Sequence, residues 1–340
     1  FSGGSYDHKR MSLDTGYVIN DKVAVRMNGL YEHSRSHRKG TKLQRYGFSP
    51  TVTIKPTNKT KIVIQAELFK DDRTADRGIP SENGRPFKRG SKNTFYGNAA
   101  LSPTDTNKKA VSIHIDHKFN ENIKVRNRME YSKFDKRYQN IMANSAVSNN
   151  QIELAGYADE TDRENFFNQT DLLFNLDTGP LKHKIITGVE ISRQVTKQQR
   201  DYAYFGGGTS KSATVNVFNP IYTGQIDFRR DIGNKTHSHS TSVAAVYIQD
   251  HVELHPMVHV TAGVRYDRFE QDSRNRLTDS TIRSREDHIS PRFGLILKPL
   301  KRLSVYGSWS MTHQPRGGDQ LKSLTVSNAT LKAEKFINIE

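Results

Sequence analysis

Apolar and polar residues alternate through long stretches of this chain, almost from end to end. In KIVIQAEL (residues 61–68) every even-numbered residue is apolar, and all but one of the odd-numbered residues are polar or charged. AVSIHIDHKF (residues 110–119) shows the same period. Successive side chains of a β-strand point to opposite faces of a sheet, so this period predicts strands with one apolar and one charged face. We count about thirteen such runs, many of ten or more residues, whereas strands usually have about five or six.

The connections between these runs also alternate. Short turns are predicted at VINDK, TNKT, NEN, TGP, LHP and LKR. Between them lie long connections centred on residues 34–43, 72–108, 138–162, 199–238, 274–286 and 314–330. In an up-and-down antiparallel sheet this alternation brings all the long connections to one end, as in outer-membrane barrels.

Two further observations concern the membrane. The chain has no run of about eighteen apolar residues, which excludes a membrane-spanning helix. A tilted strand of roughly nine to eleven residues is long enough to cross a bilayer, and a charged inner face requires a water-filled lumen. The sequence therefore predicts an all-β, transmembrane, antiparallel up-and-down β-barrel. A soluble β-sandwich or propeller with one apolar face per strand is the alternative fold.

The charge balance limits the possible partners. The chain has 52 Lys and Arg against 36 Asp and Glu, a formal net charge of +16, which suits phosphate, anionic lipid or an anionic small ligand. The absence of cysteine excludes disulfides, thiolate metal sites and cysteine nucleophiles. No G-x-S-x-G, H-E-x-x-H or phosphate-binding loop is present, and Asp171 and Glu190 are expected to pair with Lys or Arg on an inner face. We predict that the protein is not an enzyme.

Several segments, taken in order, resemble TonB-dependent outer-membrane siderophore receptors. They are GGSYDHKRMSLDTGYVINDKVAVRMNGLYE, DRGIPSENGRPF, SPTDTN, RENFFNQTDLLFNLDTGPLKHKIITGVE, AAVYIQDHVEL with VTAGVRYDRFE, ISPRFGLILKP and LKAEKFINIE. The resemblance covers essentially the whole chain, and the most similar subgroup is the catecholate, Fiu-like type. It implies a location in the outer membrane of a Gram-negative bacterium. Barrels of such transporters have roughly 22 strands and a plugged lumen. Residues 1–340 are therefore expected to be the N-terminal part of the barrel domain, without the plug and the C-terminal strands.

The resemblance also implies a function. Such a receptor takes up a ferric siderophore, here of the catecholate type, and is energised by TonB acting through the missing N-terminal region. The ferric siderophore is the transported ligand, no cofactor is bound covalently, and outer-membrane lipid and lipopolysaccharide are expected partners. The alternatives are a passive porin-like or structural barrel and a basic nucleic-acid-binding β protein. We expect no nucleic-acid partner, because the basic residues are spread over many loops and inner faces and no RNP or OB-like pattern is present.

The resemblance makes the connection containing DRGIPSENGRPFKRG (residues 76–90) an extracellular loop that leans over the lumen. Its predicted ligand-binding residues are the cations Arg77, Arg85, Lys88, Arg89 and Lys92 and the aromatic residues Phe87, Phe95 and Tyr96. Cations and flat apolar rings together suit an anionic ferric catecholate. Tyr202 and Tyr204, close to a triple glycine, are predicted to recognise the same ligand. The alternatives are lipopolysaccharide phosphates or solvent for the cations, and a mobile loop tip for the tyrosines.

Two other polar segments are considered. HSRSHRKGTK presents Arg35, Arg38, Lys39 and Lys42 without an acidic residue, so we expect a solvated face, a contact with lipopolysaccharide or a contact with the ligand. His237 and His239 lie two residues apart, hence on one side of a strand, as a pair of metal ligands requires. No third ligand with matching spacing is present, and no metal site is predicted.

The period also predicts the direction of individual side chains. The residues expected to point outward are Ile62, Ile64, Leu68, Val111, Ile113, Ile115, Leu172, Phe174 and Leu176. The residues expected to point inward are Arg26, Glu67, His114, Lys118, Arg126 and Arg128.

Overall fold

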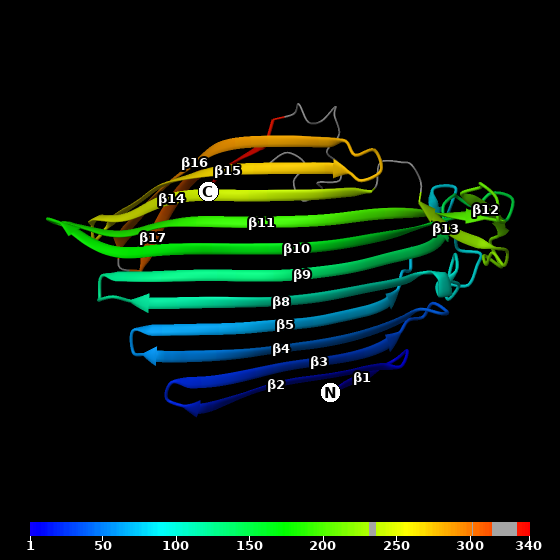
Figure 1. Ribbon diagram of the computed structural model, residues 1–340, viewed down its shortest axis with the longest axis horizontal. Helices are drawn as coiled ribbons and strands as arrows, with labels where there is room; N and C mark the ends of the chain where they lie inside the picture. Colours follow the sequence, from blue (N-terminus) through cyan, green and yellow to red (C-terminus); the bar gives the residue numbers. More distant parts are fainter. Residues whose placement is uncertain (231–235, 301, 315–331) are drawn as a thin grey trace.

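The computed structural model describes residues 1–230, 236–300, 302–314 and 332–340, and its main feature is one large antiparallel sheet (Figure 1). The strands along this sheet are β1 (Ser2–Gly4), β2 (His8–Asn20), β3 (Val23–Arg35), β4 (Lys42–Thr57), β5 (Thr60–Thr74), β8 (Pro103–Lys118), β9 (Ile123–Ala143), β10 (Gln151–Thr178), β11 (Leu181–Phe205), β14 (His237–His255), β15 (Val258–Asn275), β16 (Thr281–Leu300), β17 (Leu303–Gln314) and β18 (Glu334–Ile339). Two shorter strands, β12 (Ser212–Asn216) and β13 (Ile226–Arg230), pair with β10 and β11. A separate hairpin consists of β6 (Ser81–Glu82) and β7 (Arg85–Pro86), and a 3-10 turn, η1, spans Ala99–Leu101.

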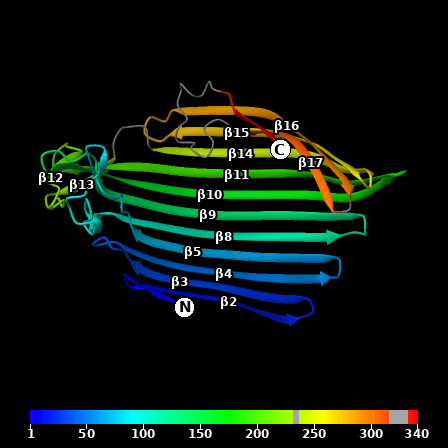
Figure 2. The same ribbon diagram turned by 180° about the vertical axis from the view of Figure 1, so that it is seen from behind.

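The strands of the main sheet follow each other in sequence order. Each is hydrogen-bonded to the next along the path from β1 to β18, and the register is antiparallel throughout. In both Figure 1 and Figure 2, β17 runs obliquely across its neighbours, so the sheet curls at this side. The predicted curved, single sheet in meander order is confirmed, and its two edges do not meet in the described residues.

Tight turns and long connections lie at opposite ends of the sheet. Two-residue turns join β2 to β3, β4 to β5, β10 to β11 and β14 to β15, and they lie at one end. The long connections, together with β12 and β13, gather at the other end, which we call the long-loop end (Figure 1). The alternation predicted from the sequence is thus confirmed. The predicted connection at residues 314–330 lies, apart from its first residue, outside the described residues.

The strand register assigns every predicted outward and inward residue to a face. Ile64 lies opposite Ile113 across β5 and β8, and Val125 lies opposite Leu172 across β9 and β10. Residues that face each other across a ladder share a face, and following these pairs from strand to strand places the whole predicted outward set on one face. The predicted inward set lies on the other face, where His114 is opposite Arg128. Both predictions of side-chain direction are confirmed.

Burial distinguishes the concave side from the convex side. Asp171 and His239, on the charged face, are each 2% exposed. Large apolar residues on the opposite face, such as Val246 and Ile289, are 50% and 59% exposed. Side chains crowd together on the concave side of a curved sheet, so we call the charged face the inward face and the apolar face the outward face.

The outward face carries an apolar band of the height of a bilayer. Runs of nine residues cross this band on three strands, from Ile123 to Tyr131, from Val258 to Tyr266 and from Ile289 to Leu297. A strand tilted in a bilayer needs about nine to eleven residues to cross it. So large an exposed apolar surface is explained by contact with lipid. Within the described residues, no helix is long and apolar enough to cross a membrane.

The inward face is held together by ion pairs between strands. Arg126 Nε lies 3.2 Å from Asp171 Oδ2, and Arg265 Nη1 lies 2.9 Å from Glu190 Oε2. These contacts confirm that the two carboxylates pair with cations. A buried carboxylate needs such partners, because leaving its charge uncompensated costs several kcal/mol, on the order of 3–5.

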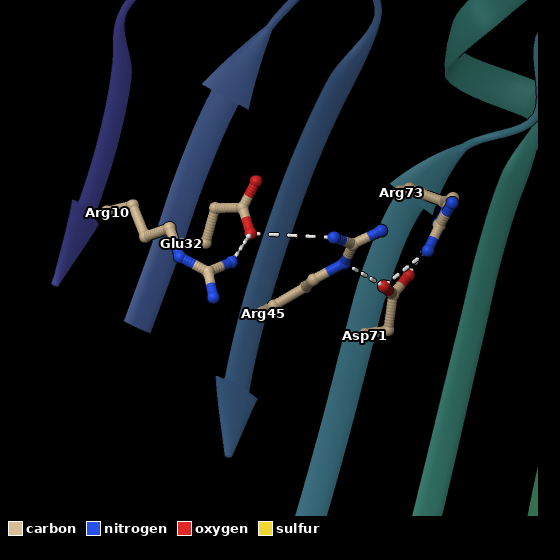
Figure 3. Close-up of polar contacts among 5 residues, drawn as sticks. All are labelled: Arg10, Glu32, Arg45, Asp71 and Arg73. Carbon is tan, nitrogen blue, oxygen red and sulfur yellow. Dashed lines mark hydrogen bonds and ion pairs between the residues drawn. The ribbon is translucent and has the colours of Figure 1, made fainter. Parts of the chain in front are cut away.

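A longer chain of charges crosses β2 to β5 towards the long-loop end (Figure 3). Glu32 accepts from Arg10 at 2.9 Å and from Arg45 at 3.4 Å. Asp71, 3% exposed, accepts from Arg45 and Arg73, each at 2.5 Å. Positive and negative groups alternate, so each acid lies between two guanidinium groups. The chain therefore ties four successive strands together.

The predicted long connections are longer than those in the structure, because the strands extend into them. β9 continues to Ala143 and β10 begins at Gln151, inside the predicted loop 138–162. β11 continues to Phe205, and the connection predicted at residues 72–108 is reduced to residues 75–102. The reason is that the outward face no longer meets lipid beyond the apolar band. The hydrogen-bonded ladder continues there, but the alternation of apolar and charged residues ends.

Candidate ligand site at the long-loop end

The long loops pack on the outward face of the extended strands. Ile141, Leu154 and Ala203 belong to β9, β10 and β11 and lie on that face by strand register. They are the floor of a buried apolar cluster, which we call the loop core. Its members are Phe87, Tyr96, Ile141, Val147, Ile152, Leu154, Ala203, Phe205 and Val217. Loop segments from three different connections therefore share one core above the apolar band.

Two of the aromatic residues predicted to stack on a ligand, Phe87 and Tyr96, belong to this packing. Phe87, Phe95 and Tyr96 are 3%, 8% and 4% exposed. The Phe87 and Tyr96 rings meet edge to face, with 6.3 Å between their centroids. In this structure the three rings are covered by other loop residues, because an apolar ring in a loop gains more from packing on a neighbouring apolar surface than from water. Phe87 and Tyr96 thus lie in the loop core on the outward face, and Phe95, which is not part of that core, is also buried.

Arg89 is also engaged within the loops. Its guanidinium pairs with Glu82, donates to Asn150 Oδ1 at 3.0 Å and lies 5.3 Å from the Phe87 ring centroid. The Phe218 ring centroid lies 5.7 Å away on another loop. The hydrogen bond from Arg89 lowers the pKa of Glu82 below its usual value. Arg89 therefore links the loop at residues 81–90 to the loops at residues 144–150 and 217–225.

The remaining predicted cations of this loop are exposed. Arg85, Lys88 and Lys92 are at the surface, and within the described part of the chain none of the three side chains forms an ion pair. They are free to meet an anion from solution. Arg77 differs from them, because it turns to the inward face, where its Nη1 donates to the hydroxyl of Tyr138 at 3.4 Å.

Tyr202 and Tyr204 lie on the inward face of β11. Tyr202 is paired with Tyr157 on β10 and with Arg229 on β13, so it belongs to the sheet and not to a loop tip. Lys211 Nζ lies 4.9 Å from the Tyr202 ring centroid, and the Arg229 guanidinium lies 5.1 Å from the Tyr204 ring centroid. The two tyrosines are therefore held in fixed positions among cations.

Sequence reasoning missed the residues that complete this group. The rings of Tyr138 and Tyr157 lie 5.8 Å apart, and the Arg200 guanidinium lies 4.1 Å from the Tyr157 ring centroid. Arg200 also pairs with Asp159. Positions 138, 157 and 200 are in step with the inward-facing residues of their strands, and this spacing could have identified them. They fell, however, inside segments predicted as loops.

Together these residues form a half-buried patch, which we call the tyrosine–arginine cluster. It comprises Arg77, Tyr138, Tyr157, Arg200, Tyr202 and Tyr204. Burial raises the pKa of Tyr138, and the Arg77 guanidinium opposes this shift, so the hydroxyl stays protonated at neutral pH. The cluster offers flat rings, hydroxyl groups and cations on one wall. Such a surface can stack on a planar anionic ligand and neutralise its charge.

The structure offers no comparable set of metal ligands. Among residues 1–230, 236–300, 302–314 and 332–340, no group of three or more His, Cys, Asp or Glu side chains is arranged to hold a metal ion. His237 and His239 stack on each other with 5.4 Å between ring centroids. A stacked pair of this kind is a packing arrangement and leaves a metal without a third protein ligand.

Comparison with known proteins supports the fold. A probable TonB-dependent siderophore receptor, PiuA of Acinetobacter baumannii, is 23% identical over 376 residues, covering 100% of this chain and 50% of that protein. The ferrichrome outer membrane transporter and phage receptor of Escherichia coli K12 is 25% identical, covering 89% of this chain and 44% of that protein. The chain thus spans about half the length of the curated relatives it matches.

Solved structures agree with the sequence relatives. The crystal structure of PiuA superposes with a TM-score of 0.84 at 21% identity, covering 99% of this chain and 52% of that one. The closed form of the ferric-catecholate import receptor Fiu from Escherichia coli K12 superposes with a TM-score of 0.80 at 20% identity, covering 98% and 53%. The profile of the family described as TonB dependent receptor-like, beta-barrel matches residues 46–340. The chain therefore belongs to this family of outer-membrane β-barrels.

Proposed function

We propose that residues 1–340 form part of the barrel wall of an outer-membrane receptor that takes up ferric siderophores. The observation that carries this proposal is the tyrosine–arginine cluster, which lies on the inward face at the long-loop end. A ligand that enters a barrel of this family from outside would pass this wall. The matched relatives are receptors and transporters, not enzymes, and several are named for siderophores.

The cluster would bind the ferric chelate without catalysing a reaction. Its rings and cations would hold the chelate at the mouth, while Arg85, Lys88 and Lys92 would attract it from solution through their charge. Between the cluster and the tight turns, the ion-paired inward face would remain hydrated and would offer the ligand no apolar surface to bind. Opening of the lumen would require a plug and energy from TonB. We place both the plug and the closing strands of the barrel outside residues 1–340.

We further propose that the ligand is a catecholate. The matched relatives include receptors named for ferrichrome, ferrioxamine and metal-pseudopaline as well as the catecholate receptor Fiu. Chemistry of the cluster favours the catecholate, because Tyr138, Tyr157 and Tyr202 offer aromatic faces to a ligand that is itself aromatic. A ferric tris-catecholate is also anionic, which suits Arg77 and Lys211.

The test uses the complete receptor with the double substitution Tyr138→Leu and Tyr157→Leu. Leucine keeps apolar bulk but removes the rings, and each lost aromatic contact is worth about 0.5–1.5 kcal/mol. We expect affinity for a ferric tris-catecholate to fall about tenfold. Affinity for a ferric trihydroxamate should change less, because that ligand has no aromatic ring to stack.

The matched control is Tyr131→Leu, a tyrosine on β9 that lies on the outward face and is 47% exposed. It should leave both affinities unchanged, and heat-modifiable electrophoretic mobility should show that all variants assemble. Equal affinity of the wild-type and double-variant receptors for both chelates would remove the cluster from the binding site. An equal loss for both chelates would keep the site but contradict the catecholate assignment.

A further inference from the structure

A cavity lies at the long-loop ends of β4 and β5, apart from the tyrosine–arginine cluster. Its volume is about 690 Å³, within the range of roughly 300–1,000 Å³ that is usual for small-molecule sites. Lys39, Lys42 and Arg73 line it, and no Asp or Glu does. Arg73 is already paired with Asp71, but within the described residues neither lysine forms an ion pair. The cavity therefore holds two uncompensated positive charges.

The loop that carries these lysines is fixed in place. Arg38, only 8% exposed, pairs with Asp76 at 2.6 Å and donates to the carbonyl oxygen of Thr94 at 2.9 Å. Gly40 approaches Ala99 so closely that a β-carbon there would lie 2.8 Å from the Ala99 β-carbon. The sequence interpretation of this segment as a solvated face was wrong for Arg38, since a buried guanidinium with satisfied hydrogen bonds is a structural support. Lys39 and Lys42 on either side of Gly40 are thus held at the cavity.

The cavity is close to the lipid-facing surface. Lys42 and Thr74 line it and continue the outward rows of β4 and β5 that contain Tyr46 and Leu68. Lys42 is four residues from Tyr46, which is about 13 Å along a strand and less in depth because the strand is tilted. Tyr46 is 42% exposed, as suits a tyrosine at the upper border of the apolar band. This places Lys42 near the level of lipid headgroups, and Lys39 lines the same cavity.

The mouth of the cavity is apolar. Phe218 and Ile221 line it and are 51% and 52% exposed, and Phe95 lies deeper at 8%. Two lysines beside exposed apolar side chains match a ligand that carries a phosphate and an apolar portion. Lysine is a compact charge that binds phosphate well without the planar geometry that arginine requires.

We infer that this cavity binds a phosphate group of an outer-leaflet lipid. The outward position of Lys42 and the apolar mouth favour a lipid over free phosphate, and the lack of exposed tyrosine faces distinguishes the site from the cluster proposed for the chelate. The inference depends on the outer-membrane location of the family and not on the identity of the siderophore. Binding at this site would fix the loops around residues 36–42 and 218–221 to the membrane surface.

The experiment measures binding of lipid A, a glycolipid with two phosphates, to the complete receptor in a neutral detergent. The variant is Lys39→Gln with Lys42→Gln. Each lysine near an anionic lipid surface contributes roughly fivefold in affinity, so we expect the double variant to bind lipid A roughly 10- to 30-fold more weakly. The matched control, Lys61→Gln with Lys184→Gln, removes the same charge from the inward face near the tight turns and should bind as wild type does.

Competition separates the possible sources of the anion. Inorganic phosphate at millimolar concentration and a ferric tris-catecholate should both fail to displace lipid A from the wild-type receptor. Phe218→Ala should weaken lipid A binding while the lysines remain. Equal binding by wild type and the Lys39/Lys42 variant would overturn the proposal, as would an equal loss in the control. Displacement by inorganic phosphate or by the chelate would assign the cavity to a soluble ligand instead of a lipid.

Discussion

Each of β9, β10 and β11 has a half near the tight turns, the lower half, and a half near the long-loop end, the upper half. Both halves have the same hydrogen-bonded ladder but different surroundings. In the lower half, residues such as Tyr131 and Val189 face lipid, and the opposite face carries ion pairs. In the upper half the outward positions Ile141 and Leu154 are covered by the loop core, while the inward side carries the tyrosine–arginine cluster. One continuous pleat thus serves as a membrane wall below and as the floor of a small extracellular domain above.

The two halves differ in what shields each outward apolar side chain from water. Lipid covers Val189, which is 53% exposed in the protein alone, whereas protein covers Leu154 completely. Lipid chains rearrange around a changed side chain, but packed loop residues do so only in part. We therefore expect the same kind of substitution to have different costs in the two halves.

The largest effect is expected for Leu154→Ala. This change leaves a cavity in the loop core and should cost about 2–5 kcal/mol of the local free energy of unfolding. The barrel below should remain folded, so limited proteolysis should cut residues 75–102 and 206–225 faster while heat-modifiable mobility is retained. The matched control is Leu176→Ala on the same strand, which is 46% exposed on the lipid side and should leave proteolysis unchanged. If both variants behave alike, the loop core is not a separately stabilised unit.

The second prediction concerns charge on the outward row of β11. Val189→Lys places an ammonium in the apolar band and should lower the free energy of unfolding in a bilayer by about 2–4 kcal/mol. Val195→Lys, six residues further along the same row, should cost less than about 1 kcal/mol because that position is above the band. Denaturant titrations in lipid vesicles measure both values. A similar cost at both positions would mean that the band extends further than we place it.

The sequence predicted the lower half of the molecule better than the upper half. Alternation in segments such as residues 110–119 depends on two solvents of opposite kind, lipid outside and water inside, so strand, register and face could all be inferred. At Tyr138 and Tyr157 both faces meet protein and water, and the pattern disappears although the strands continue. Of the proposed cluster, Arg77, Tyr202 and Tyr204 were therefore named from the sequence, while Tyr138, Tyr157 and Arg200 were not.

Burial in the loops could not be foreseen for a related reason. Phe87 and Tyr96 are far in sequence from Leu154 and Phe205, and nothing local to the loop shows that these partners exist. Their composition alone suited ligand stacking equally well. Only the tertiary contacts distinguish an aromatic ring that is packed in a core from an exposed ring that is available to bind a ligand.

The third prediction separates the two kinds of loop cation. Changing Arg85, Lys88 and Lys92 together to Gln should weaken binding of a ferric tris-catecholate at low salt by about 0.2–1 kcal/mol per charge, with a smaller effect at high salt. Loop stability should not change, because these side chains have no ion pair among the described residues. Arg89→Gln should do the reverse, with faster proteolysis of the loop and little direct effect on affinity. If the triple variant binds the chelate as tightly as the wild-type receptor at both salt concentrations, these charges contact the membrane surface and not the ligand.

The smallest effect is expected from pH at the Glu82–Arg89 pair. The pKa of Glu82 is lowered in the folded protein, so its contribution is complete above the unfolded value near 4.5 and is lost as the pH falls through the folded value. Residues 1–340 contain no cysteine, so once any cysteine elsewhere in the receptor is replaced, Ser91→Cys can carry a single spin label that reports loop mobility. In the complete receptor, mobility should stay constant between pH 8 and 6 and rise only below about pH 4. Glu82→Gln should make the loop more mobile at neutral pH and remove this dependence, which distinguishes Glu82 from other carboxylates nearby. A change in mobility between pH 8 and 6, or a retained acid transition in Glu82→Gln, would show that another group controls the loop.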